Sequence, residues 1–346
     1  MTRNLLVAIM RDEAPYVIEW VAHHRALGFT DILVFTNDCS DGTDRMLDRL
    51  MDLRLVVHAP NPKSVFQTLG VWQVAALRYA SAFGLYRQAD WACTVDADEF
   101  IEISAGDSTL AALFEAAGEC DVISLPVIGY SSDDRPGIGN GEVLSRFRRP
   151  RVNLADREGW TPRAQAVKSL SRPGIPGAHF RNHRPKIDGF SATGRLWLDG
   201  SGNAMPPEFT DRKVNGYLFT SYPRLAHVNH HSLRSLHGFM VKALRGDAVT
   251  ASRLGVETKQ QIDNAVRYWT SRNHSDQPPR DAHLPPSAKA LKSELHADPI
   301  LADLHGHAIG HHERMVARLL QSPAGQSLDR ALRGTVDGRA QQVTTT

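Results

Sequence analysis

The stretch WACTVDADEF, residues 91–100, is the part of the sequence that decides the fold. Residues 91–95 are mostly apolar, which is typical of a strand that is covered on both faces. Asp96 and Asp98 follow at once, and side chains two residues apart on an extended chain point the same way. Ligands of open α/β sheets bind beyond the carboxyl ends of the strands. The pair therefore favours a hard, oxygen-rich site for Mg²⁺ or Mn²⁺ over a solvated acidic turn.

The residues before this stretch alternate between strand and helix patterns. Apolar runs predict strands, and apolar residues at helical spacing predict helices, with Asp12 as the first N-cap and Pro15 in the first turn. The alternation indicates βαβ units. We therefore predict an α/β fold with a Rossmann-like, mostly parallel sheet flanked by helices. The expected strands are 5–10, 32–35, 53–58 and 91–95. The first expected helix ends at Gly28, the second spans 43–51, and the third spans 64–87 with an interruption near Gly70.

The character of the chain changes after about residue 130. Gly, Pro, Arg and His become frequent, and only short strands are expected, at 122–127, 143–147 and 165–170. Helical patterns return at 232–244 and 257–268, and again after a proline-rich linker at 276–286. We predict an α/β half over 1–130, a loop-rich half over 131–250, a helical C-terminal extension over 251–333 and a disordered tail over 334–346.

Composition limits the classes of protein to consider. The 346 residues carry a formal net charge of +2, which is too small for a general nucleic-acid binder. The three cysteines, Cys39, Cys93 and Cys120, form no C-x-x-C pair and fit a reducing compartment. No stretch reaches the roughly 20 apolar residues that a membrane-spanning helix needs. We expect a cytoplasmic protein without a transmembrane segment, and peripheral association with a membrane stays open.

Polar residues follow the other predicted strands as well. Residues 11–13, RDE, end the first strand, and Asn37 and Asp38 end the second. Such side chains can bind the base or ribose of a nucleotide, although helix capping and turn formation are the structural alternatives. Farther along, residues 227–231 read HVNHH, and one of these imidazoles can complete a metal shell or act as a base. Lys242 and Arg245 are cations suited to a phosphate.

The order of these motifs resembles the family 2-like glycosyltransferases of the GT-A fold, in particular a bacterial branch related to family 92. Residues 11–28, with RDE, EW, HH and a closing Gly, are similar to the opening of the family. Residues 91–100 are similar to its "W…D-x-DEF" segment, and residues 229–246 to its "NHY…KS…F…K…RG" segment. The chain departs from the pattern at residues 36–43, TNDCSDGT, and has His231 for the usual Tyr and Arg234 for the usual Lys.

The resemblance implies transfer of a sugar from a nucleotide-sugar donor, with inversion, in assembly of surface polysaccharide or glycolipid. It implies that residues 1–130 form the nucleotide-sugar-binding half and residues 131–250 the acceptor-side half of one catalytic domain. It implies that Asp96 contacts the ribose and the metal, Asp98 holds the metal, and His230 is the last ligand. Lys168 and His179 match a family segment on the acceptor or diphosphate side. The expected donor-binding residues are Arg11, Glu13, Asn37, Asp38, Asp96 and Lys168. The general base stays open among Asp133, Asp134, His183 and His231, and Asp134 and His231 are taken as the leading candidates.

Two other functions compete with this one. The first is a non-catalytic protein that binds nucleotides or polysaccharide, which the intact D-x-D with a distant histidine disfavours. The second is a sugar nucleotidyltransferase, which needs a glycine-rich basic loop near the N-terminus. Residues 11–13 have no such glycines, and no G-x-G-x-x-G follows the first strand to suggest a dehydrogenase. The acceptor stays unknown, whether carbohydrate, lipid-linked or other.

Overall fold

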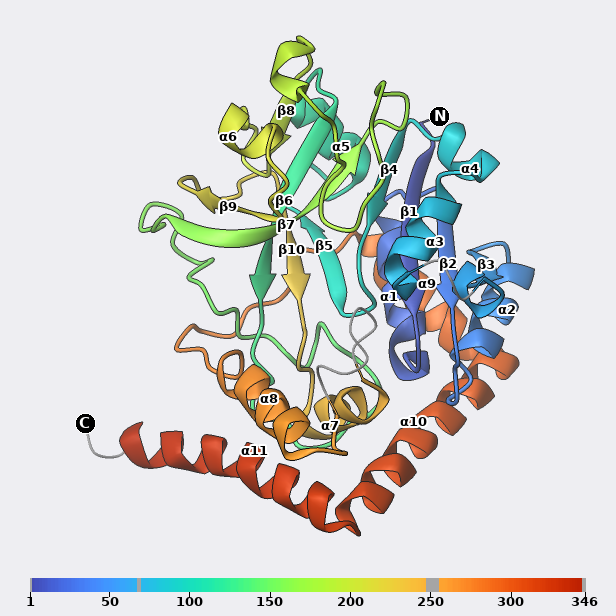
Figure 1. Ribbon diagram of the computed structural model, residues 1–346, viewed down its shortest axis with the longest axis vertical. Coiled ribbons are helices and arrows are strands. Elements are labelled where there is room, and N and C mark those ends of the chain that lie inside the picture. The colour runs from blue at the N-terminus through green and yellow to red at the C-terminus, as the bar shows by residue number, and fades with distance from the viewer. Residues whose placement is uncertain (1, 67–69, 247–254, 344–346) are drawn as a thin grey trace.

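The computed structural model describes residues 2–66, 70–246 and 255–343, and its architecture is α/β. In this part of the chain ten strands form one sheet with helices on both sides (Figure 1). The predicted α/β class with a mostly parallel sheet is confirmed. None of the described helices is both long and apolar enough to cross a membrane.

The N-terminal half of the sheet is parallel, with the strand order β3-β2-β1-β4. Leu6 and Ala8 of β1 pack on one face with α1 and α2, whereas Leu5 and Val7 pack on the other face with α3. Both faces are therefore buried, which explains the continuous apolar runs in the sequence. The elements are β1 (Asn4–Met10), α1 (Ala14–Ala26), β2 (Asp31–Thr36), α2 (Thr43–Asp52), β3 (Val57–Pro60), α3 (Trp72–Ala80), α4 (Gly84–Arg87) and β4 (Trp91–Thr94).

The second half of the sheet is mixed and continues in the order β4-β7-β6-β10-β5. β5 (Glu99–Ile103) does not pair with β4, although only four residues separate them; it pairs antiparallel with β10 (Ala226–His230) at the far end. The Asp96–Asp98 turn therefore lies between the two halves of the sheet. The remaining elements are α5 (Leu110–Ala117), β6 (Val122–Gly129), β7 (Arg163–Ser171), β8 (Trp197–Asp199), α6 (Pro207–Thr210) and β9 (Gly216–Phe219).

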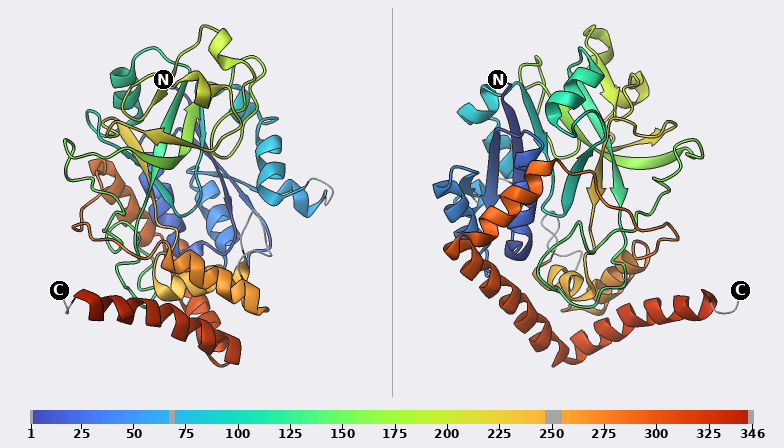
Figure 2. Two further views of the ribbon diagram at one scale, coloured as in Figure 1. Left: turned by 60° about the vertical axis from the view of Figure 1, so that its left-hand side comes forward. Right: turned by 180° about the vertical axis from the view of Figure 1, so that it is seen from behind.

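The chain after β10 is helical. α7 (Leu236–Arg245) and α8 (Lys259–Thr270) lie below the carboxyl ends of the strands in Figure 1. α9 (Pro286–Ala297) packs along α1, and α10 (Pro299–Leu320) contacts α1, α2 and α7. α11 (Pro323–Val343) contacts α8 and α10 and then projects from the body, as both views of Figure 2 show. The C-terminal extension thus braces the N-terminal half of the protein from outside.

Several local predictions are wrong, each for a local reason. Residues 143–147 form no strand, because the backbone N–H of Val143 donates to buried Glu19 and the chain turns there. β3 starts at Val57, since Arg54 has a φ of 60° and closes a turn after α2. Asp12 is no N-cap: its φ is 50°, and its carboxylate accepts hydrogen bonds from Ser40 instead.

The helical stretch expected over 64–87 is broken. A short 3₁₀ turn (Pro62–Ser64) precedes it, and α3 and α4 are separate helices. Gly70 has a φ of 79°, a left-handed conformation that a continuous α-helix does not contain. At the other end of the chain, the tail expected from residue 334 continues α11 to Val343, and residues 344–346 lie outside the described part. Alanine, arginine and glutamine favour a helix there.

A buried hydrogen bond joins α10 to the loop after β2. His312 Nε2 lies 2.8 Å from Asp41 Oδ2, and both side chains are almost fully buried. The other oxygen of Asp41 accepts hydrogen bonds from the backbone and hydroxyl of Thr43 at the start of α2. The C-terminal extension therefore fixes the loop that carries Asn37 and Asp38.

We predict that His312→Ala lowers the free energy of unfolding by about 3 kcal/mol, because it leaves the Asp41 carboxylate buried without its imidazole partner. The matched control is His311→Ala at the neighbouring position, where the imidazole is only partly buried and the change should be within about 0.5 kcal/mol. Urea unfolding of the two variants measures the difference, and equal shifts would contradict a stabilising role for the pair.

Candidate functional site

The turn that carries Asp96 and Asp98 is held rigidly from three sides. The residues that hold it come from α1, from the end of β10 and from the start of the segment leading to α7. Each of its carbonyl oxygens accepts a hydrogen bond: Trp20 Nε1 donates to Asp96 (3.2 Å), Arg234 Nη2 to Ala97 (2.9 Å) and the His231 backbone N–H to Asp98 (2.8 Å). Bonds of this kind preorganise the two carboxylates.

The turn opens onto a cavity of about 270 Å³, called here the donor cavity. It lies beyond the carboxyl ends of β1 and β4, where the sequence predicted a ligand site. Among its lining residues are Arg11, Asp96, Asp98, His230, Lys242 and Arg245. Arg11 and Arg245, which are 234 residues apart in the sequence, therefore meet the acidic turn in one place.

Asp98 is the most constrained carboxylate of the donor cavity. Its oxygens lie 2.8 Å from Lys242 Nζ and 3.5 Å from His230 Nε2. Burial alone would raise the pKa of Asp98, but the Lys242, His230 and Arg234 cations lower it well below the usual range. Burial would likewise lower the pKa of His230, whereas Asp98 raises it above 6.5. The structure thus places His230 beside Asp98, and the role of the two side chains as metal ligands stays a prediction.

Asp96 is more open, and its side chain is 38% exposed. Lys168 Nζ lies 3.1 Å from Asp96, 2.8 Å from Glu99 and 2.6 Å from the Asn182 side-chain oxygen. An ammonium group has three N–H donors, so these partners use all of them. Lys168 is completely buried and is not part of the cavity wall. Lys168 therefore positions Asp96. The donor contact that was predicted for Lys168 would have to be indirect, through Asp96.

Glu13, like Lys168, is held in place by charged side chains around it. It is buried and bonded through both oxygens, to Arg234 Nη1 at 2.6 Å and to Arg245 Nη2. Burial would raise the pKa of Glu13, and the two guanidinium groups lower it below its usual value. Glu13 lines the donor cavity, as does Arg11. With both oxygens bonded, Glu13 is better placed to hold two arginines than to contact a nucleotide directly.

Asn37 and Asp38, also predicted to bind the donor, follow β2 but are not part of the cavity wall. Asn37 is buried, and Asp38 is exposed with a φ of 47°. The two side chains contact each other at 3.4 Å. The structure therefore brings Arg11, Glu13, Asp96, Asp98 and His230 together and leaves the second strand end outside this cavity.

The two leading candidates for the general base lie away from the donor cavity. His231 is 1% exposed and packs against Tyr130 with 4.6 Å between ring centroids. Burial lowers its pKa to about 3, and neither ring nitrogen has a hydrogen-bond partner in the described chain. Asp134 is exposed, and the Asn273 side chain lies 3.3 Å from it. Asp133 instead accepts a hydrogen bond from the Arg148 backbone at 2.8 Å.

His183 is the base candidate that the structure brings to the site. It lines the donor cavity and is only partly buried. Its Nδ1 lies 3.1 Å from the Val167 carbonyl oxygen, and a carbonyl only accepts, so Nδ1 carries the hydrogen and Nε2 keeps its lone pair. Burial and the Lys168 cation lower the pKa of His183 below 6.5, so the ring is neutral at pH 7. Nothing in the local sequence separates it from the other fifteen histidines.

The charges around the donor cavity nearly balance. Four carboxylates, Glu13, Asp96, Asp98 and Glu99, stand against five cations, Arg11, Lys168, Arg234, Lys242 and Arg245. Within residues 2–66, 70–246 and 255–343, no three His, Cys, Asp or Glu side chains converge as a metal centre. The carboxylate and imidazole pair of Asp98 and His230 suits Mn²⁺ or Mg²⁺ in chemistry, but it needs further ligands from outside the protein.

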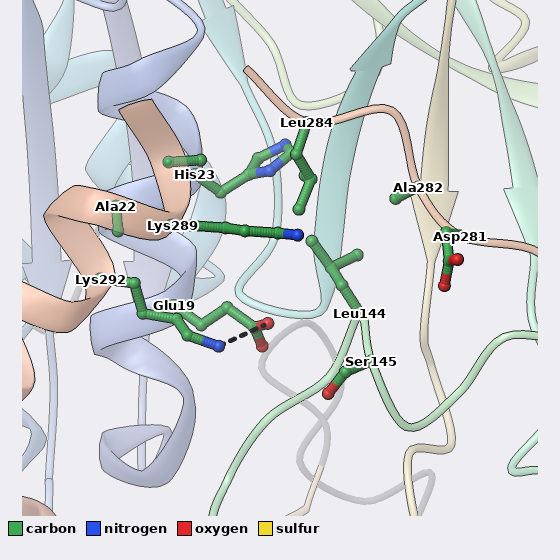
Figure 3. Close-up of a pocket in the computed structure, with 11 residues that line it drawn as sticks. Glu19, Ala22, His23, Leu144, Ser145, Asp281, Ala282, Leu284, Lys289 and Lys292 are labelled. Atoms are coloured by element: carbon green, nitrogen blue, oxygen red, sulfur yellow. Dashed lines mark ion pairs between the residues drawn. The ribbon is translucent and has the colours of Figure 1, made fainter. Parts of the chain in front are cut away.

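A second cavity of about 270 Å³ lies between α1 and α9 and shares no lining residue with the first (Figure 3). Lys289 extends across it toward Leu144 and Leu284, and Lys292 pairs with Glu19 at 3.8 Å (Figure 3). His23 on its wall is bonded to the Ile101 carbonyl oxygen. This cavity is a seam between the C-terminal extension and α1, and it holds none of the predicted site residues.

Comparison with known proteins bears on the N-terminal half of the chain. Residues 7–148 match the family model "Glycosyltransferase family 92". No curated protein sequence matches the chain significantly. This match spans β1, the acidic turn and β6, and it ends before Lys168, His183 and His230. The resemblance to family 92 is thus supported over these residues. The narrower prediction, a family 2-like enzyme of the GT-A fold, stays a prediction.

The solved structures that resemble the chain have low TM-scores and low sequence identities. The crystal structure of S. aureus TarS 1–349 is 11% identical, covering 96% of this chain and 92% of that one, with a TM-score of 0.31. The same protein in complex with UDP-GlcNAc is 12% identical over 99% and 92%, with a TM-score of 0.33. The S. cerevisiae mannosyltransferase Ktr4p is 7% identical over 38% and 41%, with a TM-score of 0.25. The family match over residues 7–148 confirms the predicted enzyme class, a glycosyltransferase.

Proposed function

We propose that the protein transfers a sugar from a nucleotide-sugar donor to an acceptor hydroxyl with the help of a divalent cation. The observation that carries this proposal is the donor cavity itself. Asp98 and His230 face it together, Asp96 lies exposed beside them, and Lys242, Arg11 and Arg245 add cations that suit a diphosphate. A pocket lined only by acidic groups would repel the diphosphate, and one lined only by basic groups would repel the metal.

Charge balance supports the cation. The site is nearly neutral, so a bound diphosphate adds negative charge that the five protein cations, already shared with four carboxylates, compensate only in part. Asp98 and His230 would hold Mn²⁺ or Mg²⁺ together with diphosphate oxygens, and Asp96 would join them only after its side chain turns toward the cation, since the three do not converge on one point in the described chain. Such a cation neutralises the charge that develops on the leaving diphosphate. Because the side chains alone form no complete metal centre, cation and donor should bind together.

His183 is the base that we propose for the acceptor. The acceptor oxygen attacks the anomeric carbon, the bond from that carbon to the diphosphate breaks, and the acceptor proton moves to Nε2 of His183. A single displacement of this kind inverts the anomeric centre. The hydrogen bond from Nδ1 to the Val167 carbonyl oxygen at 3.1 Å keeps Nε2 as the proton acceptor. Asp134 and His231 would need a rearrangement to reach the donor cavity.

The cysteines bear on the cell compartment of the protein. Cys39, Cys93 and Cys120 are free thiols, and two of them are buried, which suits a reducing cytoplasm. We propose a cytoplasmic enzyme that uses activated sugars made there, with polysaccharide or glycolipid assembly as its setting and peripheral membrane contact as an option.

The test is release of nucleoside diphosphate from a panel of UDP-, GDP- and dTDP-sugars, including UDP-GlcNAc, with Mn²⁺ or Mg²⁺. We expect turnover of at least one donor, slow with water alone, and a loss of about 100-fold with EDTA. Calorimetric binding of a donor without any turnover would support the non-catalytic alternative instead. Turnover that EDTA leaves unchanged would remove the cation from the proposal, and Lys242, Arg11 and Arg245 would then neutralise the diphosphate alone.

A further inference from the structure

A larger cavity of about 670 Å³, called here the basic cavity, adjoins the donor cavity. The two share Gln73, Asn182 and His183 as lining residues. The basic cavity lies between α3 and the loop that follows β7. His183 thus stands at the junction of the two spaces, and a group in either cavity can reach it.

The charge of the basic cavity is one-sided. Arg78, Arg181 and Lys186 line it, and no aspartate or glutamate does. Lys186 has an exposed partner, Asp188, at 2.8 Å. Arg78 and Arg181 are exposed, and neither side chain has a hydrogen-bond or ion-pair partner in the described chain. The wall therefore offers two guanidinium groups that a ligand could bind through paired N–H donors.

The walls of the basic cavity are well supported. His179 and Lys186 exchange backbone hydrogen bonds at 2.8 and 3.0 Å, so the loop between them is tied at its base and carries Arg181 and His183. Behind it, the rings of Tyr86 and Phe180 pack with centroids 5.0 Å apart. Val74 and Leu77 of α3 add apolar surface opposite. Apolar surface beside guanidinium groups suits a sugar ring that carries an anion.

We infer that the basic cavity binds the acceptor, and that the acceptor carries a phosphate or a carboxylate group near the hydroxyl that receives the sugar. This inference rests on the proposed function. The donor fills the first cavity, and the base must touch the acceptor hydroxyl, so the acceptor has to approach His183 from the other side. That side is the basic cavity, and its charge selects an anion.

The experiment measures binding by calorimetry with the donor cavity filled by nucleoside diphosphate and Mn²⁺. Three probes share one trisaccharide: the neutral sugar, the same sugar with a phosphate monoester, and the same sugar oxidised to a uronate. We expect at least one anionic probe to bind about tenfold or more tightly than the neutral one. The comparison of phosphate with uronate tells which anion the cavity takes.

The double variant Arg78→Gln, Arg181→Gln should remove this preference and leave the affinity for nucleoside diphosphate unchanged, since neither arginine lines the donor cavity. Arg45→Gln is the matched control, because Arg45 is an exposed arginine of α2 that lines neither cavity. Equal binding of all three probes, no binding of any, or an unchanged preference in the double variant would overturn the inference. Absence of donor turnover with every nucleotide sugar would instead overturn the proposed function.

Discussion

Asp98→Asn is expected to lower kcat/KM for sugar transfer by about 10²–10³-fold, the range typical of lost electrostatic stabilisation at a reacting group. The substitution keeps the shape of the side chain but removes its negative charge. Asp98 lies 2.8 Å from Lys242 and 3.5 Å from His230, and the proposed cation would lose one of its anionic ligands. Steady-state kinetics with Mn²⁺, and Mn²⁺ titration in the presence of nucleoside diphosphate, measure the two effects.

The fold should survive Asp98→Asn, but at a cost. Lys242 is left without its carboxylate in a largely buried position, which suggests a loss of about 2 kcal/mol in the free energy of unfolding. A matched control is Glu142→Gln, which removes the charge of another ion pair, with Lys292 at 2.7 Å, outside the donor cavity. That variant should keep full activity. Near-normal turnover of Asp98→Asn, with Mn²⁺ binding intact, would show that Asp98 is structural only.

Local patterns made much of the N-terminal half of the sheet predictable. The parallel strands β1, β2 and β4 are buried on both faces, so their apolar runs stand out in the sequence. The acidic pair after β4 could be placed at a sheet edge from the strand period alone. Pairings between distant residues could not be predicted in this way. β5 leaves its neighbour β4 to pair with β10, with Glu102 opposite His227 and Phe100 opposite Asn229, and no local signal marks that choice.

The roles of individual site residues depended on burial, which the sequence does not show. Lys168 and Glu13 are of residue types that often bind ligands. In the structure, however, Lys168 forms ion pairs with Asp96 and Glu99. Glu13 forms ion pairs with Arg234 and Arg245. The two adjacent histidines differ in the same way. His230 ends β10 facing the cavity, whereas His231 turns into an aromatic cluster with Tyr130 and Phe100. Alternation along a strand predicts opposite directions for neighbours, but not which of them faces the cavity.

The other large effect is expected for His183→Ala, which should reduce kcat for transfer by about 10²–10⁴-fold, the usual contribution of a general base. The affinity for nucleoside diphosphate should stay close to that of the parent protein. Added imidazole should restore part of the rate, because the small base can occupy the space vacated at the junction of the two cavities. A purely structural histidine would not show such rescue.

The pH dependence supplies a second readout for His183. The base works only when neutral, so transfer should fall as the pH drops through its pKa, which burial and Lys168 hold below 6.5. His183→Gln should lose this acid limb along with the rate. His305→Gln is the matched control, since His305 also bonds a backbone carbonyl, that of Asn140, but lines neither the donor cavity nor the basic cavity. If His183→Ala keeps its rate within about tenfold and imidazole adds nothing, the proton must go elsewhere, and Asp134 or His231 would have to move into the donor cavity during the reaction.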